Sequence, residues 1–475
     1  MENADANKFF ASYLKKNAVE ALTISRMQEL IEYFMESAAR LCVSKCIDGR
    51  VHGSKGKGRP PKSVTFFRGE GNIVDVGPRN AAFWDRLYKV ILDAKMNTPG
   101  TPALYIALGH KSHSGRGCAK HESQDEVALA TVMMQAHRLR QQTNPDELYV
   151  IHGMTETDYM SECYHFPDGK KTVIDTAKII EGLKNTIRNP DDVFQEGFLS
   201  QPISDPKIAK WIDGKTAGDL LDGRKGYAMF NSLQYGIAME TLLMRSIAGI
   251  AASKGKVNKV IHPELFKIVW GKLNNIKGLP EGLRGSLLYQ IIFNIAYSLY
   301  KRKQIPNMSQ EERVKELDHG EELICFGDGF ELLSRNSAIL AKIGRGDNTE
   351  ALRTAQNVWK HRFGETKTPK IHMNIEVPGK ITSWNSFTSY VLNKLETMRA
   401  EVIEVFGTNV HIMATYSYED RKMFLPVQTL IYGRQSIDEK RVFPMNIVEG
   451  MQSHEYTESN LVLRERDYAA AICAA

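Results

Sequence analysis

Two cysteines, one histidine and an aspartate–arginine pair carry the chemistry that this sequence offers. Cys46 and Cys118 supply thiols and His110 supplies an imidazole. Zn²⁺ favours these ligand types, and a catalytic zinc site has three protein ligands and a fourth position for water. Alternation along an extended segment puts the side chains of Cys46, Asp48 and Arg50 on one side. The sequence therefore predicts zinc at Cys46, His110 and Cys118. An ion pair between Asp48 and Arg50 is expected beside it, keeping the Asp48 carboxylate ionised and aimed.

The elements that must position these residues alternate between strands and helices. Apolar strands are expected at 41–43, just before Cys46, and at 103–108, just before His110. The carboxyl ends of neighbouring parallel strands meet at one edge of an α/β sheet, so the two ligands would converge there. Cys118 precedes a helix expected to reach residue 141, and a helix start favours the thiolate. Further strands are expected at 73–76 and 148–151, and further helices at 25–42 and 81–95.

The second half of the chain repeats this order of elements. Thr368-Pro369 precedes one of its strands, as Thr101-Pro102 precedes the strand at 103–108, and the segment 334–338 (SRNSA) resembles 78–82 (PRNAA). We infer a diverged internal duplication. The expected helices are 287–300 and 386–405, and the expected strands are 322–326, 370–377 and 410–416.

The second copy is expected to lack the chemical residues. Where the first copy has the Cys46 segment, the second has KRKQIPN (301–307), and where the first has His110, the second has Val377-Pro378. We expect a structural partner that completes a core and one wall of the site. Between the copies, residues 171–285 contain polar stretches and an apolar helical pattern near 229–252, which indicates a mostly helical insertion.

Bulk composition narrows the function classes without naming one. The chain has 475 residues, 42% hydrophobic and 25% charged, which is typical of globular proteins with several domains. Its net charge of +6 does not indicate nucleic-acid binding. No apolar run is long enough for a membrane span, and the N-terminus has no pattern of a secretory signal. Six scattered cysteines favour a reducing compartment over a disulfide framework.

Several of these residues also have a simpler, structural interpretation. Cys46 could be a buried structural thiol, and His113 or His121 could replace His110 as the ligand. Asp48 and Arg50 could form a plain salt bridge. The GRPPK segment (58–62) of the basic loop at 54–62 could be a minor-groove arm, but a solvated loop is expected. The helix around Met133 and Met134 is expected to contribute both to the core. Arg79-Asn80 is expected to be structural, and the remaining cysteines, Cys42, Cys163, Cys325 and Cys473, are expected to be inert.

At the Cys46 segment the chain resembles the β-class carbonic anhydrases, whose signature is Cys-x-Asp-x-Arg followed by a His and a second Cys. It is most similar to their carboxysome-shell branch, through CIDGR (46–50), the long loop from His110 to Cys118, GCAKH (117–121) and TETD (155–158). Two departures are a short N-terminal region and the insertion at 171–285. By this resemblance the zinc ligands are Cys46, His110 and Cys118, and the catalytic pair is Asp48 with Arg50.

The resemblance implies an α/β fold of two fused modules, each a mostly parallel sheet flanked by helices, with the second degenerate. The expected domains are 1–39 (helical segment), 40–170 (catalytic), 171–285 (insertion) and 286–475 (zinc-free). It implies reversible hydration of carbon dioxide to bicarbonate with Zn²⁺ as the cofactor. We expect a homo-oligomer, a dimer or larger, in the cytoplasm, with the carboxysome shell or its enzymes as candidate partners. No membrane span and no nucleic acid are expected.

Two other functions fit the same residues. A hydrolase of carbon disulfide or carbonyl sulfide could use the same zinc site, and access to its pocket would decide. The other is a non-catalytic scaffold stabilised by zinc: a fourth protein ligand that closes the site, such as His113 or Asp48, would favour it, and an open position for water would favour the enzyme.

Overall fold

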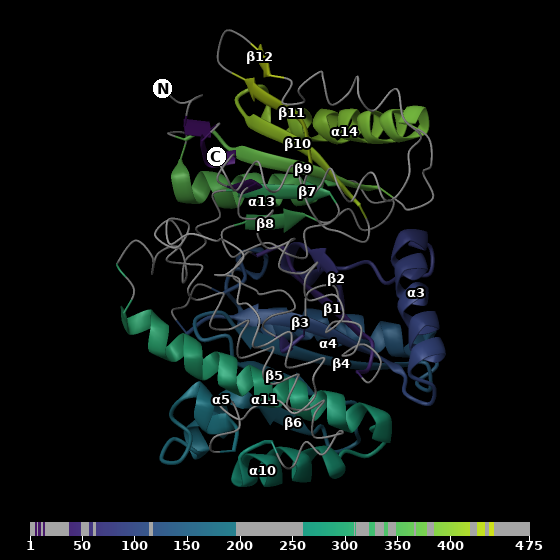
Figure 1. Ribbon diagram of the computed structural model, residues 1–475, viewed down its shortest axis with the longest axis vertical. Coiled ribbons are helices and arrows are strands. Elements are labelled where there is room, and N and C mark those ends of the chain that lie inside the picture. Colours follow the sequence, from purple (N-terminus) through teal and green to yellow (C-terminus); the bar gives the residue numbers. More distant parts are fainter. Residues whose placement is uncertain are drawn as a thin grey trace, which may run out of the picture.

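The computed structural model shows an α/β protein with two six-stranded, mostly parallel sheets flanked by helices (Figure 1). The structure describes residues 5–6, 8–10, 13–14, 38–48, 57–59, 63–113, 117–195, 260–307, 309, 323–327, 337–340, 348–364, 367–377, 384–418, 425–432 and 437–440. Among these residues, no helix is both long and apolar enough to cross a membrane.

The first sheet has the strand order β2-β1-β3-β4-β5-β6. Its strands are β1 (Leu41–Cys46), β2 (Val64–Gly69), β3 (Ala103–Lys111), β4 (Leu148–Glu156), β5 (Glu162–His165) and β6 (Val173–Asp175). The first four strands in this order pair in parallel, and β5 and β6 are added antiparallel. The helices of this part of the chain are η2 (Glu70–Asn72), α3 (Ala81–Asn97), η3 (Ala119–His121), α4 (Asp125–Gln142), α5 (Thr176–Gly182), η4 (Pro190–Val193), α10 (Pro263–Asn274), α11 (Glu281–Gln304) and η7 (Ile305–Asn307).

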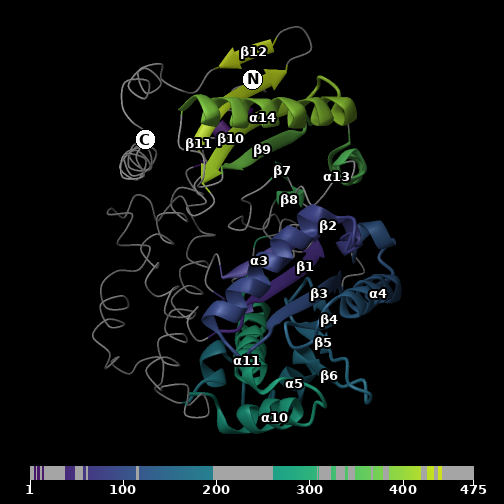
Figure 2. The ribbon, with the colours of Figure 1, turned by 90° about the vertical axis from the view of Figure 1, so that its right-hand side faces the viewer.

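The second sheet has the order β12-β11-β10-β9-β7-β8, which is the order of the first sheet with its direction reversed. Its strands are β7 (Leu323–Gly327), β8 (Ser337–Leu340), β9 (Lys370–Val377), β10 (His411–Tyr418), β11 (Leu425–Tyr432) and β12 (Ile437–Lys440), with helices α13 (Asn348–Phe363) and α14 (Trp384–Phe406). The pairing is again parallel from β8 to β10 and antiparallel beyond. The two sheets meet where β2 lies next to β8 (Figures 1 and 2).

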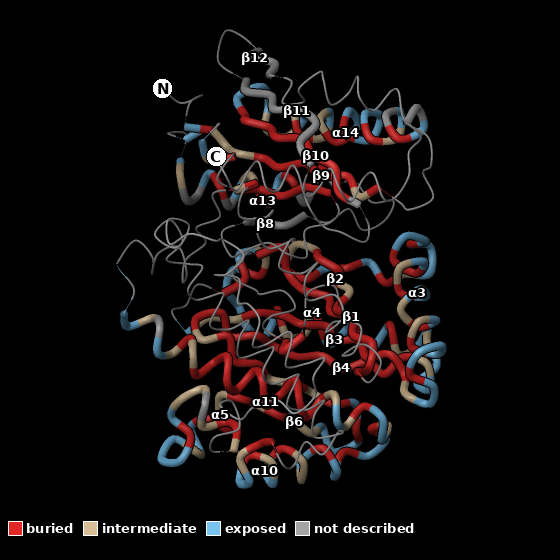
Figure 3. Tube along the Cα trace, in the orientation of Figure 1, coloured by how far each residue is buried: buried red, intermediate tan, exposed pale blue. Residues whose placement is uncertain are grey.

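The strands of the first sheet are apolar on both sides, so helices cover both faces. The strands are accordingly buried along most of their length (Figure 3). On one face, α3 and α4 pack through residues such as Leu87 and Val132. On the other face, α10 and α11 pack through residues such as Leu265 and Ile292. The helix α11 therefore shares its core with the first sheet, although the sequence analysis places residues from 286 onward in the second domain. That domain boundary stays a prediction.

The second sheet is covered in a similar way. On one face α13 and α14 pack against the strands, through Leu352 and Val391 among others. On the other face, Ala6 and Phe10 from the N-terminal segment pack against Cys325 and Met413. The start of the chain is thus part of the core of its second half.

Most of the predicted elements are confirmed, with several corrections. The strands expected at 41–43, 103–108, 148–151, 322–326, 370–377 and 410–416 are present, with bounds that differ by up to five residues, and the helices expected at 81–95, 287–300 and 386–405 are present and longer. The strand expected at 73–76 is wrong. The position next to β1 is taken by β2, and Ile73 is half exposed. The helix expected at 25–42 and the pattern at 229–252 lie largely outside the described residues, and Leu41 begins β1.

Two details of the predicted internal repeat are also wrong. KRKQIPN (301–307) ends α11 and forms η7, and it is β7 that occupies the position of β1 in the second sheet. The segments 334–338 and 78–82 are similar in sequence, but they do not belong to equivalent elements. Asn80 caps α3 by accepting from the Phe83 N–H, whereas Ser337 begins the strand β8.

The basic loop at 54–62 is not solvated where the structure describes it. Lys57 and Arg59 are 1% and 0% exposed, so the expected solvated loop is wrong there. Lys57 donates to the Glu162 carboxylate, and Arg59 donates to the Ala39 carbonyl at 2.9 Å. Gly58 has a φ of +64°, and a Cβ on it would lie 2.6 Å from Phe293. The loop therefore passes so close to α11 that only glycine fits between its two buried cations.

Two polar residues of α11 extend the contact between Lys57 and Glu162 into a buried hydrogen-bond network. Gln290 and Asn294 are fully buried one helical turn apart. Asn294 accepts from the Glu162 N–H at 3.1 Å and donates to the Met160 carbonyl at 2.9 Å. Gln290 donates to the Tyr164 hydroxyl at 3.1 Å, and that hydroxyl donates to Glu162. The network ties the loop, α11 and β5 together.

We expect Lys57→Met to destabilise the protein by about 3–5 kcal/mol, because it leaves the Glu162 carboxylate buried without its cation. Urea unfolding followed by circular dichroism measures the loss. Lys95→Met is the matched control. The pair between Lys95 and Glu147 is exposed, so its loss should cost about 1 kcal/mol or less. Equal losses in the two variants would contradict the prediction.

Candidate metal centre

Cys46 and His110 are brought together by the pairing of β1 with β3. Cys46 is the last residue of β1, and His110 is the next-to-last residue of β3. The two strands pair in parallel, with Lys45 beside Leu108, so their carboxyl ends lie side by side. Both side chains are buried, at 5% and 1% exposure. The predicted convergence at the sheet edge is thus present.

Cys118 reaches the same point from the loop after β3. It directly precedes η3, and its carbonyl accepts from the N–H groups of His121 and Ser123 at 3.0 and 2.9 Å. The ring Nε2 of His121 lies 2.9 Å from the Gly71 carbonyl, which anchors η3 to η2. These contacts hold the Cys118 side chain, which is 3% exposed, toward the sheet.

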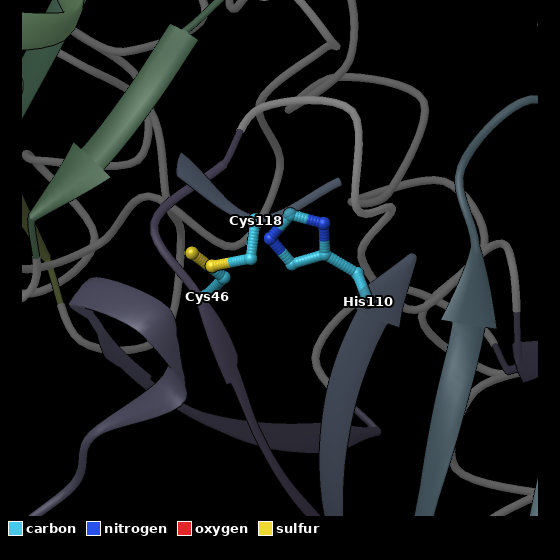
Figure 4. Close-up of side chains that lie close together, drawn as sticks. All are labelled: Cys46, His110 and Cys118. Carbon is cyan, nitrogen blue, oxygen red and sulfur yellow. The ribbon is translucent and has the colours of Figure 1, made fainter. Parts of the chain in front are cut away.

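The three side chains form a group that could hold a metal ion. One donor atom from each of Cys46, His110 and Cys118 lies within 4.8 Å of the other two. Tetrahedral Zn²⁺, with Zn–S of about 2.3 Å and Zn–N of about 2.0 Å, sets its ligand atoms about 3.5–3.8 Å apart. Small rotations of these side chains would therefore complete a zinc site. In Figure 4 the ring of His110 turns Nε2 toward the two sulfurs and Nδ1 away from them.

The buried ring nitrogens of His110 also lack a partner that a metal ion could supply. Neither ring nitrogen of His110 has a hydrogen-bond partner among the described residues. A buried polar group without a partner costs about 1–3 kcal/mol, and a metal ion would remove that cost at Nε2. Two thiols and an imidazole form the donor set that Zn²⁺ favours.

The two thiols differ in their pKa because they share a hydrogen bond. The pKa of Cys46 is raised well above its usual value, first because it hydrogen-bonds Cys118 and then because it is buried. The pKa of Cys118 is lowered, first by that bond and also by the backbone N–H groups of His121 and Lys120. Cys118 is thus the readier thiolate.

Asp48 lies against this group, and it is 4% exposed. One of its carboxylate oxygens is 3.6 Å from the Nε2 of His110, the nitrogen that faces the sulfurs. A carboxylate at this distance could accept a proton from a water on the metal or could itself occupy the fourth position. Arg50, its predicted partner, lies outside the described residues, so the expected ion pair stays a prediction.

The two other candidate histidines are placed elsewhere. His113 is exposed, and its ring lies 6.2 Å from that of Tyr159. His121 contacts the Gly71 carbonyl. Of the three histidines, His110 is the one that the structure brings to Cys46 and Cys118.

No family model and no curated protein sequence matches the chain.

The TETD segment (155–158) is tied to the end of β3 that carries His110. The N–H and the hydroxyl of Thr157 donate to the Lys111 carbonyl at 2.8 and 3.1 Å. Ser112 donates to the Asp158 carboxylate at 2.8 Å, and Glu156 accepts from the N–H groups of Asp158 and Tyr159. Reasoning from residue types did not assign these roles. The sequence signal that could have indicated these contacts is the run of turn-forming polar residues directly after the apolar strand at 148–151.

The second sheet contributes to the surroundings of the centre. Cys46, Ile47 and Cys118 belong to one apolar cluster with residues of β7, β9 and α14. The Thr354 hydroxyl on α13 donates to Glu70, whose carboxylate also lies 3.1 Å from the Lys120 ammonium. The second half of the chain thus packs against the segment that holds Cys118.

Two predictions concern residues away from the metal centre, the methionines of α4 and the other cysteines. Met133 and Met134 are 47% and 54% exposed, so their assignment to the core is wrong, because α4 turns them away from the sheet. Cys42 lies in the core beneath α3 and α4, where burial raises its thiol pKa to about 12. Such a thiol is unreactive, as expected. Cys473 lies outside the described residues.

We expect Cys46→Ser, His110→Ala and Cys118→Ser each to lose most of the zinc that the wild-type protein binds, because each removes one of three ligands. Atomic emission on purified protein gives the metal content per chain. Cys163→Ser removes a half-buried cysteine outside the group and serves as the control. Full zinc content in the three ligand variants would contradict the assignment.

Zinc affinity should fall as the pH falls. Metal binding needs the thiolate, and the raised pKa of Cys46 keeps its thiol protonated near neutral pH, so binding releases a proton. Each proton released weakens the affinity by about tenfold per pH unit on the acid side. Competition with a chromophoric chelator between about pH 6 and 8 measures the slope, and an affinity independent of pH would contradict it.

Proposed function

We propose that this chain is a zinc-dependent carbonic anhydrase that hydrates carbon dioxide reversibly to bicarbonate. The observation that carries the proposal is the buried group of Cys46, His110 and Cys118, with the Asp48 carboxylate beside it. Three ligands of this type leave a fourth position for solvent. The order and spacing of these residues, with Arg50, also match the signature of the β-class enzymes, which supports this activity over other zinc chemistry.

Bound zinc would supply Lewis acidity that lowers the pKa of a coordinated water to about 7. The Asp48 carboxylate lies where it can accept a hydrogen bond from that water and orient it. Arg50 would hold the carboxylate ionised and away from the metal. The apolar cluster that contains Ile47 and residues of the second sheet suits carbon dioxide, which carries no net charge, and limits bulk water at the centre.

We further propose that the two sheets arose by duplication and that the second has lost its site. Strand order and the pattern of parallel and antiparallel pairing agree between the two sheets. Ala103 at the start of β3 pairs with Leu148 of β4, and Lys370 at the start of β9 pairs with His411 of β10 in the same way. Both β3 and β9 follow a Thr-Pro pair. In this alignment Val377 stands in the position of His110.

Assignment to the carboxysome-shell branch rests on the motif resemblance alone. A homo-oligomeric state, a cytoplasmic location and shell or enzyme partners are part of the same proposal. They would be tested by size-exclusion chromatography with light scattering and by localisation of the tagged chain.

A zinc-stabilised scaffold is the second candidate, and the place of Asp48 favours it. Its carboxylate lies 3.6 Å from the metal-facing nitrogen of His110, close enough to close a four-ligand site after a small rotation. A site closed by four protein ligands is structural rather than catalytic.

Stopped-flow hydration of carbon dioxide, followed with a pH indicator, tests the enzyme against the scaffold. We expect zinc-loaded wild type to be active and Asp48→Asn to lose about 10²-fold or more in kcat/KM while keeping its zinc, because the variant cannot accept a proton. Cys163→Ser should match wild type.

Zinc-loaded wild type without hydration activity would contradict the carbonic anhydrase proposal. Activity of the same preparation on carbonyl sulfide or carbon disulfide would then assign the hydrolase alternative. Inactivity on all three, together with lower stability of the metal-free protein, would assign the scaffold.

A further inference from the structure

The nitrogen of His110 that faces away from the sulfurs has no assigned role. Nδ1 is buried and has no hydrogen-bond partner among the described residues. Figure 4 shows it on the side of the ring opposite Cys46 and Cys118. If Nε2 binds the metal, Nδ1 must carry the proton, and a buried N–H without an acceptor is costly.

A second polar group without a partner lies on the next strand. Thr155 on β4 is the parallel register partner of His110 on β3. Residues paired in this way lie about 4.8 Å apart with their side chains on the same face of the sheet. Thr155 is 0% exposed, and its hydroxyl also has no partner among the described residues. Two buried, unsatisfied polar groups therefore occupy neighbouring positions.

The other residues near this position are less suitable acceptors. Met154, which precedes Thr155, lies on the opposite face, where a Cβ on Gly109 would be 2.6 Å from its sulfur. Glu162 follows Thr155 in the same row across the sheet, but its carboxylate accepts from Lys57 and Tyr164. The Thr155 hydroxyl is the side-chain oxygen that the register places next to the His110 ring.

We propose that Thr155 is the positioning residue of the metal centre, whose hydroxyl accepts a hydrogen bond from the Nδ1–H of His110. A metal-bound histidine commonly donates its second N–H to such a partner, which fixes the tautomer and the ring orientation. The bond would hold Nε2 toward the two sulfurs and would satisfy both buried groups at once.

The surroundings of Thr155 are built to keep this contact in place. The Glu156 N–H donates to the Ser161 carbonyl at 2.8 Å, and the Thr157 N–H donates to the Lys111 carbonyl at 2.8 Å. The residues on both sides of the proposed bond are therefore fixed by backbone hydrogen bonds. On the far side of Thr155, the buried network of Lys57, Glu162 and Asn294 anchors β5.

The inference rests on the metal site of the proposed function but not on its activity, so zinc affinity is the readout. Chelator competition on the full chain should show about 10- to 100-fold weaker zinc binding in Thr155→Val, which keeps the shape and removes the acceptor. Thr155→Ser, which restores a hydroxyl, should bind like wild type. Thr131→Val is the control, since its hydroxyl lies on the exposed side of α4 and bonds only the Val127 carbonyl in the structure.

A measurement on zinc-loaded wild type covers the case in which Thr155→Val fails to fold. Protein with ¹⁵N-labelled histidine should show a downfield imidazole N–H signal that His110→Ala removes and that exchanges slowly with water. Unchanged zinc affinity in folded Thr155→Val, or a His110 N–H in rapid exchange, would overturn the proposal. Wild type that binds no zinc would instead overturn the metal site itself.

Discussion

Parallel pairing of β1 with β3 is the constraint on which the candidate metal centre depends. Cys46 and His110 are 64 residues apart in the sequence, and the strand register sets their side chains at one edge of the sheet. A shift of that register by one residue would move one of the two ligand positions about 3.3 Å along its strand relative to the other. The apolar residues of both strands, buried on both faces, oppose such a shift. The centre is thus positioned by the core rather than by the loop that carries Cys118.

The same sheet explains why so many polar groups are buried near the centre. Beyond β4 the sheet is extended by β5, and its face toward α11 carries Thr155, Glu162 and Tyr164. Each buried charge there has a partner of opposite sign or a hydrogen-bond donor, which makes the burial tolerable. Such a network stabilises one arrangement of loop, helix and strand, because any other arrangement leaves a charge unpaired. His110 pairs with Thr155, and Thr155 pairs with Glu162, so the same network holds the strand beside His110 in place.

The sequence predicted the ligands and most strands because their signals are local. Apolar runs such as 103–108 identify buried parallel strands, and Cys, Asp and His types identify metal chemistry. The basic loop failed because burial of Lys57 depends on Glu162, which lies 105 residues away. Met133 and Met134 failed because residue type does not tell which side of α4 faces the sheet. The TETD segment (155–158) was singled out only as part of the resemblance, and no role was assigned to Thr155, because that role depends on strand register, which no local pattern encodes.

The meeting of the two sheets gives a physical role to a second sheet in which Val377 stands where His110 stands in the first. Edge strands expose unpaired backbone groups and invite association with other chains, and β8 lies next to the edge of the first sheet at β2. The apolar residues of β7, β9 and α14 also complete the core in which Cys46 and Cys118 are buried. These tasks need shape and apolar surface, not thiolates or imidazole. Under this constraint Val377 can stand where His110 stands in the first sheet, and the second sheet still serves the centre as a wall.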